Sequence, residues 1–376
     1  MADFVRALPV PARLREPLRR ALADGGRTSR PPHGGGRDVR PPWPELTEDE
    51  VRALVEHGVA PLVYRVAHLA PLREEAIRAA VVEPARFDDL HAVLAALAAQ
   101  GVVALLMKGT ALAYDIYPAP ELRPRGDTDF LIARETLDAL REAMRILGFT
   151  EILSSGDELG VRQATFTRTD RFGFEHAYDV HWDVTNTPVF SGVLRFDELR
   201  TRARALPHGM LAFSHVDALL LACIHRVAHH HDSERLIWLY DIALLRERMT
   251  REEHERFWRL AAERRVAGVC IRSIEVADEW CGRAPHARAE ELLTREEIER
   301  DEPSRVFLDR DITYGRMMLS DLRALPWRSR LRRLWQLALP PAAFMQQSFP
   351  ERSRMALPWL YVLRGARGVR RLFRRV

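Results

Sequence analysis

Lysine is almost absent from this chain. Of its 57 basic residues, 56 are arginine, and Lys108 is the one lysine. Arginine can replace lysine wherever a diffuse surface cation is enough, so a lysine kept alone indicates a place that needs a compact ammonium group. Lys108 is therefore a candidate functional residue, with chance retention as the alternative.

Cysteine is scarce, and long apolar runs are missing. The three cysteines, Cys223, Cys270 and Cys281, share no metal-ligand spacing, and an odd, sparse count argues against a disulfide framework. No run of about 18 uncharged apolar residues is present, and charges interrupt the N-terminal segment, so the sequence predicts neither a membrane span nor a secretory signal. We therefore expect a cytoplasmic protein.

Charge is distributed unevenly over the 376 residues. The net charge is +4, but residues 322–376 hold 13 arginines and one acid, Glu351, so this basic tail carries +12 and the remainder −8. Arginine alternates there with Trp, Leu and Phe at roughly helical spacing. Such a tail could bind anionic lipid, RNA or an acidic partner surface. It could also dock on the acidic body with a frayed end, which is the interpretation we favour.

Composition and periodicity divide the chain into four segments. Five Gly and five Pro in residues 25–44 predict a disordered linker, because such a composition buries too little apolar surface to become ordered. Thr47 and Glu50 have the spacing of a capping box, which indicates where the first helix of the folded part begins. The expected segments are 1–45 (helix and linker), 46–100 (N-terminal helices), 101–210 (core) and 211–376 (helical C-terminal domain with the basic tail).

The middle of the chain alternates between strand and helix patterns. Short apolar or alternating runs predict strands at 102–107, 127–132, 161–168 and 174–184. Helical patterns occupy 110–117 and 134–148, and nearly everything from residue 214 onward. Strands concentrated between helical segments predict an α+β fold.

Two aspartates begin the second strand. Asp127 and Asp129 lie two residues apart, so their side chains leave the same face of the sheet. Adjacent carboxylates repel and raise each other's pKa unless a cation lies between them. Mg²⁺ satisfies such a pair while also taking substrate phosphate oxygens. The pair alone is a weak signal, since two solvated loop acids have the same spacing.

A third acid is expected from the strand at 174–184. Alternation puts Glu175, Asp179, His181 and Asp183 on one face of that strand. If this strand lies beside the one at 127–132, one of these acids completes a cluster of three. Spacing does not choose between Asp179 and Asp183.

The turn before the first helix of the core has the features of a phosphate site. Lys108, Gly109 and Thr110 join the end of a buried strand to a helix N-terminus, where backbone N–H groups and the helix dipole favour phosphate. Gly109 allows close approach of the backbone, and the Thr110 hydroxyl can cap the helix or bond a phosphate oxygen. Arg123 and Arg125 lie in the following loop and could contact phosphates. The alternative is an ordinary strand-to-helix turn with solvated arginines.

These residues carry a family resemblance. The stretch LLMKGTALAYDIYPAPELRPRGDTDFLIARE resembles the core of the uncharacterised nucleotidyltransferase-like family of bacterial proteins, within the DNA polymerase β-like nucleotidyltransferase superfamily. The segments LLLACIHRVAHHHDSERLIWLYDIALL and LALPPAAFMQQSFPERSRM are similar to later blocks of that family. The resemblance covers about residues 50–376. It implies a polymerase β-like core, a mixed sheet with flanking helices, followed by a helical domain.

The resemblance also implies a reaction and its residues. An NTP would donate its nucleoside monophosphate to an unknown acceptor, a small molecule or a protein, with Mg²⁺ or Mn²⁺ as cofactor. Gly109 and Thr110 would open the phosphate-binding helix, Thr being a departure from the usual Ser or Gly. Asp127 and Asp129 would bind the metals, and Asp179 would be the third acid. The roles of Lys108 and Arg123 on the triphosphate are our own inference. A non-catalytic or antitoxin-like protein of the same fold is the alternative.

Histidines gather on one predicted helix. His225 and His229 lie four residues apart and therefore share a face, and a metal there would need a further ligand such as Asp241. A His-Asp metal phosphohydrolase is one interpretation, although the upstream His and downstream Asp of that pattern are missing. Histidines hydrogen-bonded between packed helices are the default. The resemblance suggests that His225, His229, Arg235 and Asp241 line the cleft, and His181 is a further candidate for it.

Overall fold

The protein consists of one mixed sheet with helices on both faces and a helical C-terminal part. The computed structural model describes residues 8–25, 43–152, 162–282, 289–309, 311–340, 342, 345 and 357–373. The strands are β1 (Leu105–Met107), β2 (Thr128–Leu131), β3 (Thr150–Ile152), β4 (Gln163–Thr169), β5 (Glu175–His181), β6 (Arg204–Ala205) and β7 (Leu211–Ala212).

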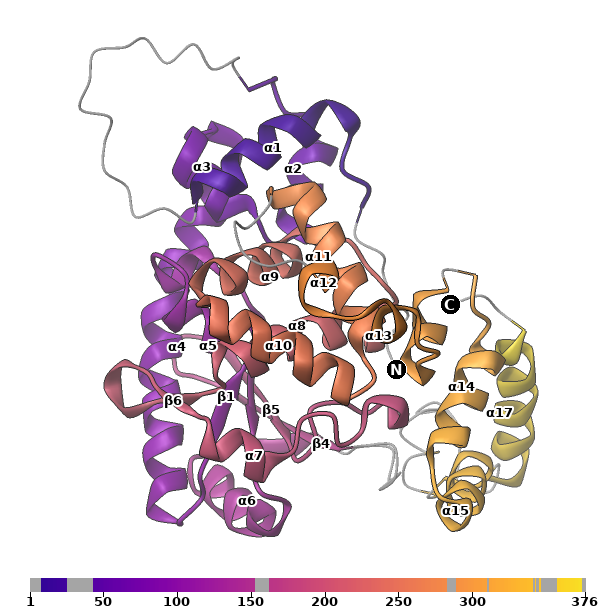
Figure 1. The fold of residues 1–376 in the computed structure, drawn as a ribbon. Helices are drawn as coiled ribbons and strands as arrows, with labels where there is room; N and C mark the ends of the chain where they lie inside the picture. Colours follow the sequence, from indigo (N-terminus) through magenta and orange to yellow (C-terminus); the bar gives the residue numbers. More distant parts are fainter. Residues whose placement is uncertain are drawn as a thin grey trace, which may run out of the picture.

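Helices precede, flank and follow the sheet (Figure 1). The α-helices are α1 (Ala12–Gly25), α2 (Glu48–Glu56), α3 (Ala60–Ala67), α4 (Arg73–Ala99), α5 (Lys108–Asp115), α6 (Leu137–Ile146), α7 (Phe196–Thr201), α8 (His215–Ala228), α9 (Leu236–Arg248), α10 (Arg251–Glu263), α11 (Ala267–Cys281), α12 (Ala289–Leu292), α13 (Arg295–Glu299), α14 (Tyr314–Ala324), α15 (Trp327–Ala338) and α17 (Leu357–Leu372). The 3₁₀ turns are η1 (Ala70–Leu72), η2 (Pro120–Leu122), η3 (Arg134–Thr136), η4 (Pro188–Phe190), η5 (Pro207–Gly209) and η6 (Pro303–Leu308). Within the described ranges, no helix is long and apolar enough to cross a bilayer.

The sheet has the order β3-β4-β5-β2-β1-β7-β6. The pairs β2–β5 and β1–β7 are parallel, and the remaining pairs are antiparallel. The expectation of an α+β fold with a mixed sheet is therefore confirmed. In the central register, Asp129 of β2 lies between Met107 of β1 and Asp179 of β5. The strand carrying the third acid thus neighbours the strand carrying the aspartate pair.

Side-chain alternation in the central strands builds a core on each face of the sheet. Leu105 and Met107 join the larger core, which continues into α1, α3 and α8–α11. Leu106 and Phe130 join the smaller core, which includes residues of α4 and α6. All of β1 is buried, as expected for a central strand covered on both faces. The sheet is therefore a buried platform that fixes the residues at its edge.

Most predicted elements correspond to observed ones. The strands expected at 102–107, 127–132 and 174–184 are β1, β2 and β5, each somewhat shorter than predicted, and the strand expected at 161–168 is β4. The expected helices correspond to α5 and to η3 with α6. The strands β3, β6 and β7 were not predicted, because two or three residues show no measurable alternation.

The N-terminal helices are joined by specific polar contacts. Thr47 and Glu50 form the predicted capping box at the start of α2. Arg13 of α1 donates from Nε to the Glu50 carboxylate over 2.8 Å, so the same acid also ties α1 to α2. Residues 26–42, which hold most of the predicted linker, lie outside the described residues. The division of the chain into four segments stays a prediction.

Candidate active site

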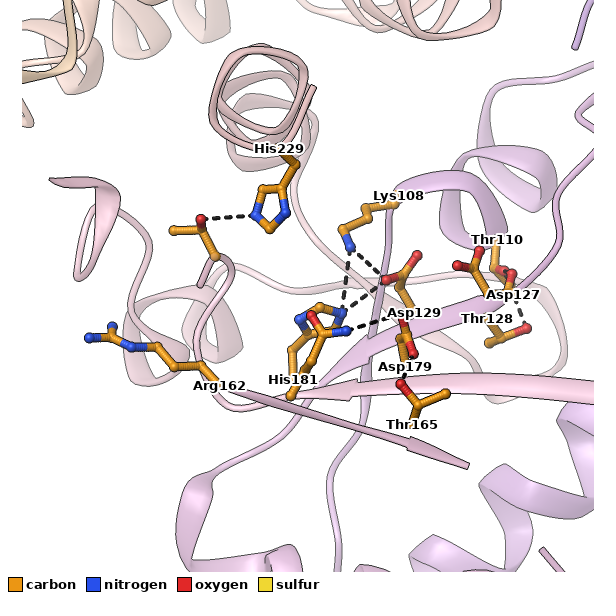
Figure 2. A network of polar contacts seen from close by, with 12 residues as sticks. Lys108, Thr110, Asp127, Thr128, Asp129, Arg162, Thr165, Asp179, His181 and His229 are labelled. Atoms are coloured by element: carbon orange, nitrogen blue, oxygen red, sulfur yellow. Dashed lines mark hydrogen bonds and ion pairs between the residues drawn. The ribbon is translucent and has the colours of Figure 1, made fainter. Parts of the chain in front are cut away.

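Two carboxylates meet at the centre of the sheet. Asp129 of β2 and Asp179 of β5 are register partners on parallel strands, and both side chains leave the same face, together with that of His181 (Figure 2). One ligand atom from each of these three residues lies within 4.8 Å of the others. Among the described residues, Asp129, Asp179 and His181 form the group of side chains that lie close enough together to hold a metal ion.

Asp129 is held by a cation and an imidazole. Lys108 donates from Nζ to Asp129 Oδ1 over 2.6 Å, and His181 Nε2 lies 3.0 Å from the same oxygen. Although burial acts in the opposite direction, the Lys108 ammonium and the His181 contact hold the pKa of Asp129 well below its usual range. Asp129 is therefore an ionised carboxylate, and the lone lysine of the chain is its counter-charge.

Lys108 has an unusual backbone conformation. Its φ is +53°, in the left-handed region, at the point where β1 becomes α5. A residue with a Cβ adopts this region at an energetic cost, and such strain gathers at functional sites. The next residue, Gly109, lies against the Arg123 guanidinium, which would be 3.4 Å from a Cβ added there. The junction therefore aims the ammonium at β2 while the helix N-terminus stays close to the loop before that strand.

Asp127 occupies the entrance to β2. Burial and the neighbouring charge of Asp129 raise the pKa of Asp127 to about 6. Its carboxylate lies on the side of Thr110 rather than in the tight group around Asp129 (Figure 2). The Thr110 hydroxyl donates to the Asp127 carbonyl oxygen and to Thr128 Oγ1, over 3.4 Å in each case. Thr110 thus ties the start of α5 to the start of β2.

The two candidates for the third acid, Asp179 and Asp183, lie in different surroundings. Asp179 accepts hydrogen bonds from Thr165 Oγ1 over 2.6 Å and from Gln163 Nε2 over 3.3 Å, both on β4. Asp183, beyond the end of β5, instead pairs with Arg162 and accepts from Ser191. Only Asp179 lies in the group with Asp129. Thr165 was missed at sequence level, although it is the register partner of Asp179 in a recognisable strand.

Arg123 is buried in an ion pair with the helical domain. Its Nη2 lies 2.7 Å from Asp241 Oδ2, its Nε also donates to that carboxylate, and Tyr117 donates to Asp241 Oδ1 over 2.7 Å. The loop before β2 is therefore fastened to α9. In the same loop, Arg125 pairs with Glu83 of α4 over 2.6 Å. A role for Arg123 on a phosphate stays a prediction.

The helical histidines stack beside the sheet. The rings of His225 and His229 are 5.2 Å apart, that of His230 lies 3.9 Å from Trp238, and His229 Nε2 is 2.9 Å from Thr185 Oγ1. Burial first, and then the charge of Lys108, lowers the pKa of His229 to about 3. These imidazoles are therefore neutral, and within the described part of the chain they belong to no group that could hold a metal. The His-Asp phosphohydrolase interpretation gains no support from this arrangement.

Arg235 lies at the start of α9. Its Nε donates to the Glu56 carbonyl oxygen over 2.9 Å, and its guanidinium lies over the Trp238 ring, 5.0 Å from the ring centre. The predicted cleft residues of the helical part are thus near one another on α8 and α9. Their role at an active site stays a prediction.

A pocket is lined by residues of α5, α8 and α9. It has an empty volume of about 580 Å³, and Lys108 forms part of its wall. Its lining is mostly apolar, with several alanines that leave space: Met107, Ala111, Leu112, Ala212, Phe213, Ala218, Leu221, Ala222 and Trp238. Its polar lining comes from Lys108, Asp115, Arg123, His225 and Asp241. A mostly apolar lining with a few polar groups is the character of small-molecule sites.

Comparison with known proteins agrees with this geometry. A family model described as an uncharacterised nucleotidyltransferase matches residues 47–282. The matched range contains the whole sheet, the carboxylates and the helical histidines, and it ends before α14, α15 and α17. No curated protein and no solved structure shows significant similarity to the chain. Because the family model spans well over half of the sequence, the chain belongs to the uncharacterised nucleotidyltransferase family.

Proposed function

We propose that the protein transfers a nucleoside monophosphate from an NTP to an acceptor by in-line displacement. The acceptor oxygen would form a bond to the α-phosphorus while the bond from that phosphorus to the bridging oxygen breaks. Pyrophosphate would leave with the electron pair, and the acceptor would lose its proton. Family membership supports the reaction class. The acceptor is either a small molecule or a protein.

The observation that carries the proposal is the register of β2 with β5. It puts the carboxylates of Asp129 and Asp179 side by side, with Asp127 just before the start of β2. With all three acids ionised, one ammonium opposes three negative charges, since burial and Lys108 lower the pKa of His181 and keep it neutral. The site then carries a net charge of −2, which a divalent cation would neutralise.

A divalent metal therefore suits these residues. Asp129 and Asp179 would hold it through oxygen, which Mg²⁺ prefers, and His181 offers a nitrogen that Mn²⁺ accepts more readily. Asp127 is the proposed third oxygen ligand, although its carboxylate lies outside this group in the structure. When bound, the metal would stabilise charge on the attacking and leaving oxygens. The Lys108 ammonium pairs with Asp129 of this set and belongs to the first residue of α5.

The start of α5 is the proposed site for the triphosphate. Backbone N–H groups at a helix N-terminus attract phosphate, and Gly109 leaves room for close approach. Lys108 would add a compact positive charge there. The apolar pocket beside Lys108 would take an uncharged part of a substrate.

Asp179 is the proposed third acid. Thr165 and Gln163 each donate to one of its oxygens, which fixes the orientation of the carboxylate toward β2. In that orientation it would complete the metal site or accept the proton of the acceptor hydroxyl.

Label transfer from NTPs tests the proposal. The purified chain would be incubated with Mg²⁺, each α-³²P-labelled NTP and a cell extract as the source of acceptor. We expect label to appear in one acceptor fraction with the wild type and to be lost with Asp127→Ala/Asp129→Ala. Transfer by that double variant at the wild-type rate would refute the proposal. NTP binding without any transfer would favour the non-catalytic alternative.

A further inference from the structure

Exposed apolar side chains concentrate in the C-terminal helices. Of the fifteen large hydrophobic residues that are exposed in the described part of the chain, ten lie between residues 319 and 373. They are Leu319, Trp327, Leu331, Leu334, Trp335, Leu339, Trp359, Val362, Val369 and Phe373. Scattered exposed apolar residues are ordinary, but a concentration of this kind indicates an interaction surface.

On α15 the apolar stripe faces away from the protein. Trp327, Leu331, Leu334 and Trp335 have the i, i+4, i+7, i+8 spacing of one helix face, and both tryptophans are 64% exposed. The less exposed residues of α15 include the polar side chains of Ser329, Arg333 and Gln336. This is the reverse of a helix that packs its apolar face on a core. In the described part of the chain this apolar stripe is left exposed, whereas the charge distribution favoured docking of the basic tail on the acidic body.

The last helix repeats the arrangement. On α17, Trp359, Val362, Ala366 and Val369 are exposed at spacings of three and four residues, and Phe373 continues the row at 80% exposure. These positions again share one face of a helix. Leu360, on another face, is buried. Two helices thus present apolar rows to solvent.

Positive charge borders these apolar rows. Arg328 and Arg330 flank the stripe of α15, and Arg367 and Arg370 are exposed on α17. The basic tail as a whole carries +12, with Glu351 as its one acid. A partner of α15 and α17 must therefore be both apolar and negatively charged.

We propose that α15 and α17 dock on the surface of an anionic lipid bilayer. Such a surface accepts Trp, Leu and Phe at the headgroup boundary while its phosphates attract arginine. RNA would pair with the arginines and stack on Trp, but it would leave Leu331, Leu334 and Val369 in water. A second copy of this chain, paired tail to tail with the first, would bring another +12 against it. The lipid surface satisfies both the apolar rows and the charge.

The two helices are attached to the body through α14. This helix contacts α15 and α17 on one side and η4 and η6 on the other, and Figure 1 shows the three helices grouped beside the rest of the molecule. None of them is part of the carboxylate site or of the range matched by the family model. Docking therefore does not depend on the proposed transfer reaction.

Vesicle co-sedimentation of the full chain tests the proposal. One set of vesicles would be phosphatidylcholine alone, and the other an equimolar mixture with phosphatidylglycerol. We expect binding to the anionic set, at least about tenfold tighter than to the neutral set at low salt and weakened by added salt. Trp327→Ala/Trp335→Ala should weaken binding to the anionic vesicles by about tenfold or more, because two large apolar side chains are removed from the interface.

The matched control is Phe172→Ala, which also removes an exposed aromatic side chain. Phe172 is 68% exposed and lies in the turn between β4 and β5, outside the basic tail. It should bind vesicles as the wild type does. Equal binding to both vesicle sets, or wild-type binding by the double tryptophan variant, would overturn the proposal. Two other results would also overturn it. One is a concentration-dependent dimer of the wild type that is lost in the double tryptophan variant, and the other is binding of the chain to RNA more tightly than to anionic vesicles. Because the changed tryptophans are exposed, all variants should show the same thermal unfolding midpoint, which separates loss of docking from loss of fold.

Discussion

Asp129 and Asp179 lie side by side as register partners on the parallel strands β2 and β5. The two residues are 50 positions apart in the sequence, and the pairing of two inner strands of the sheet brings them together. Lys108 Nζ then lies 2.6 Å from Asp129, and Thr165 Oγ1 lies 2.6 Å from Asp179. Each carboxylate therefore has its own partner, and neither is a solvated surface acid.

Replacement of the lone lysine should impair triphosphate binding. Lys108→Met removes the proposed positive charge at the α5 N-terminus, and we expect NTP affinity in the presence of Mg²⁺ to fall by about tenfold to a hundredfold. Lys108→Arg should recover only part of this loss, because a planar guanidinium does not replace a compact ammonium at a site that is mostly buried. Equilibrium binding of labelled ATP measures both.

Arg141→Met is the control for the lysine variants, since Arg141 is a half-exposed cation on α6 that pairs with Glu151. It should leave NTP affinity unchanged. If Lys108→Arg binds NTP and turns it over as the wild type does, then retention of lysine at this position is chance.

Breaking the buried ion pair between the core loop and α9 should destabilise the fold. Asp241→Asn leaves the buried Arg123 guanidinium without its counter-charge, and we expect the free energy of unfolding to fall by about 3–5 kcal/mol. The double variant Arg123→Met/Asp241→Leu should recover most of that loss, because no uncompensated charge remains. Urea unfolding measures both values. Asp138→Asn, on an exposed pair of α6, should leave the midpoint unchanged, and an equal loss there would contradict the argument.

The buried histidines should make the protein sensitive to acid. The pKa of His229 is about 3 in the folded protein, whereas an unfolded histidine has a pKa near 6.5. Between these values the unfolded chain binds more protons, so this group's contribution to stability is complete above pH 6.5 and is lost as the pH falls toward 3. The slope from His229 should be at most about 1.4 kcal/mol per pH unit.

Urea unfolding between pH 4.5 and 7.5 measures this slope. His229→Gln should reduce it, whereas His68→Asn, at an exposed histidine, should not. A slope that is the same in wild type and His229→Gln would show that His229 is charged or solvated in the folded protein.

Local patterns in the sequence reveal much of the fold, but not its long-range pairings. The capping box of Thr47 and Glu50 and the runs that form β1, β2 and β5 are visible because helix and strand periodicity are local properties. The strands β6 and β7 have two residues each, so only their neighbours in the sheet define them. No periodicity relates Arg123 to Asp241, which are 118 residues apart.

For the candidate site, too, local patterns predict some features but not the long-range contacts. Alternation already put Asp179 and His181 on one face of a strand, but choosing Asp179 over Asp183 on physical grounds required the register with β2. Lys108 forms its ion pair with Asp129 from a left-handed backbone conformation, directly after β1. Lysine rarely adopts this conformation, so the sequence does not predict it.

Comparison of Asp179→Asn with Asp183→Asn in the label-transfer assay tests the central claim most directly. Both changes remove one negative charge, in β5 or just beyond its end, and preserve side-chain shape, but only Asp179 lies in the group with Asp129. The account predicts that Asp179→Asn reduces Mg²⁺-dependent transfer by about a hundredfold or more, while Asp183→Asn retains most of it. Equal activity of the two variants, or loss only in Asp183→Asn, would contradict it.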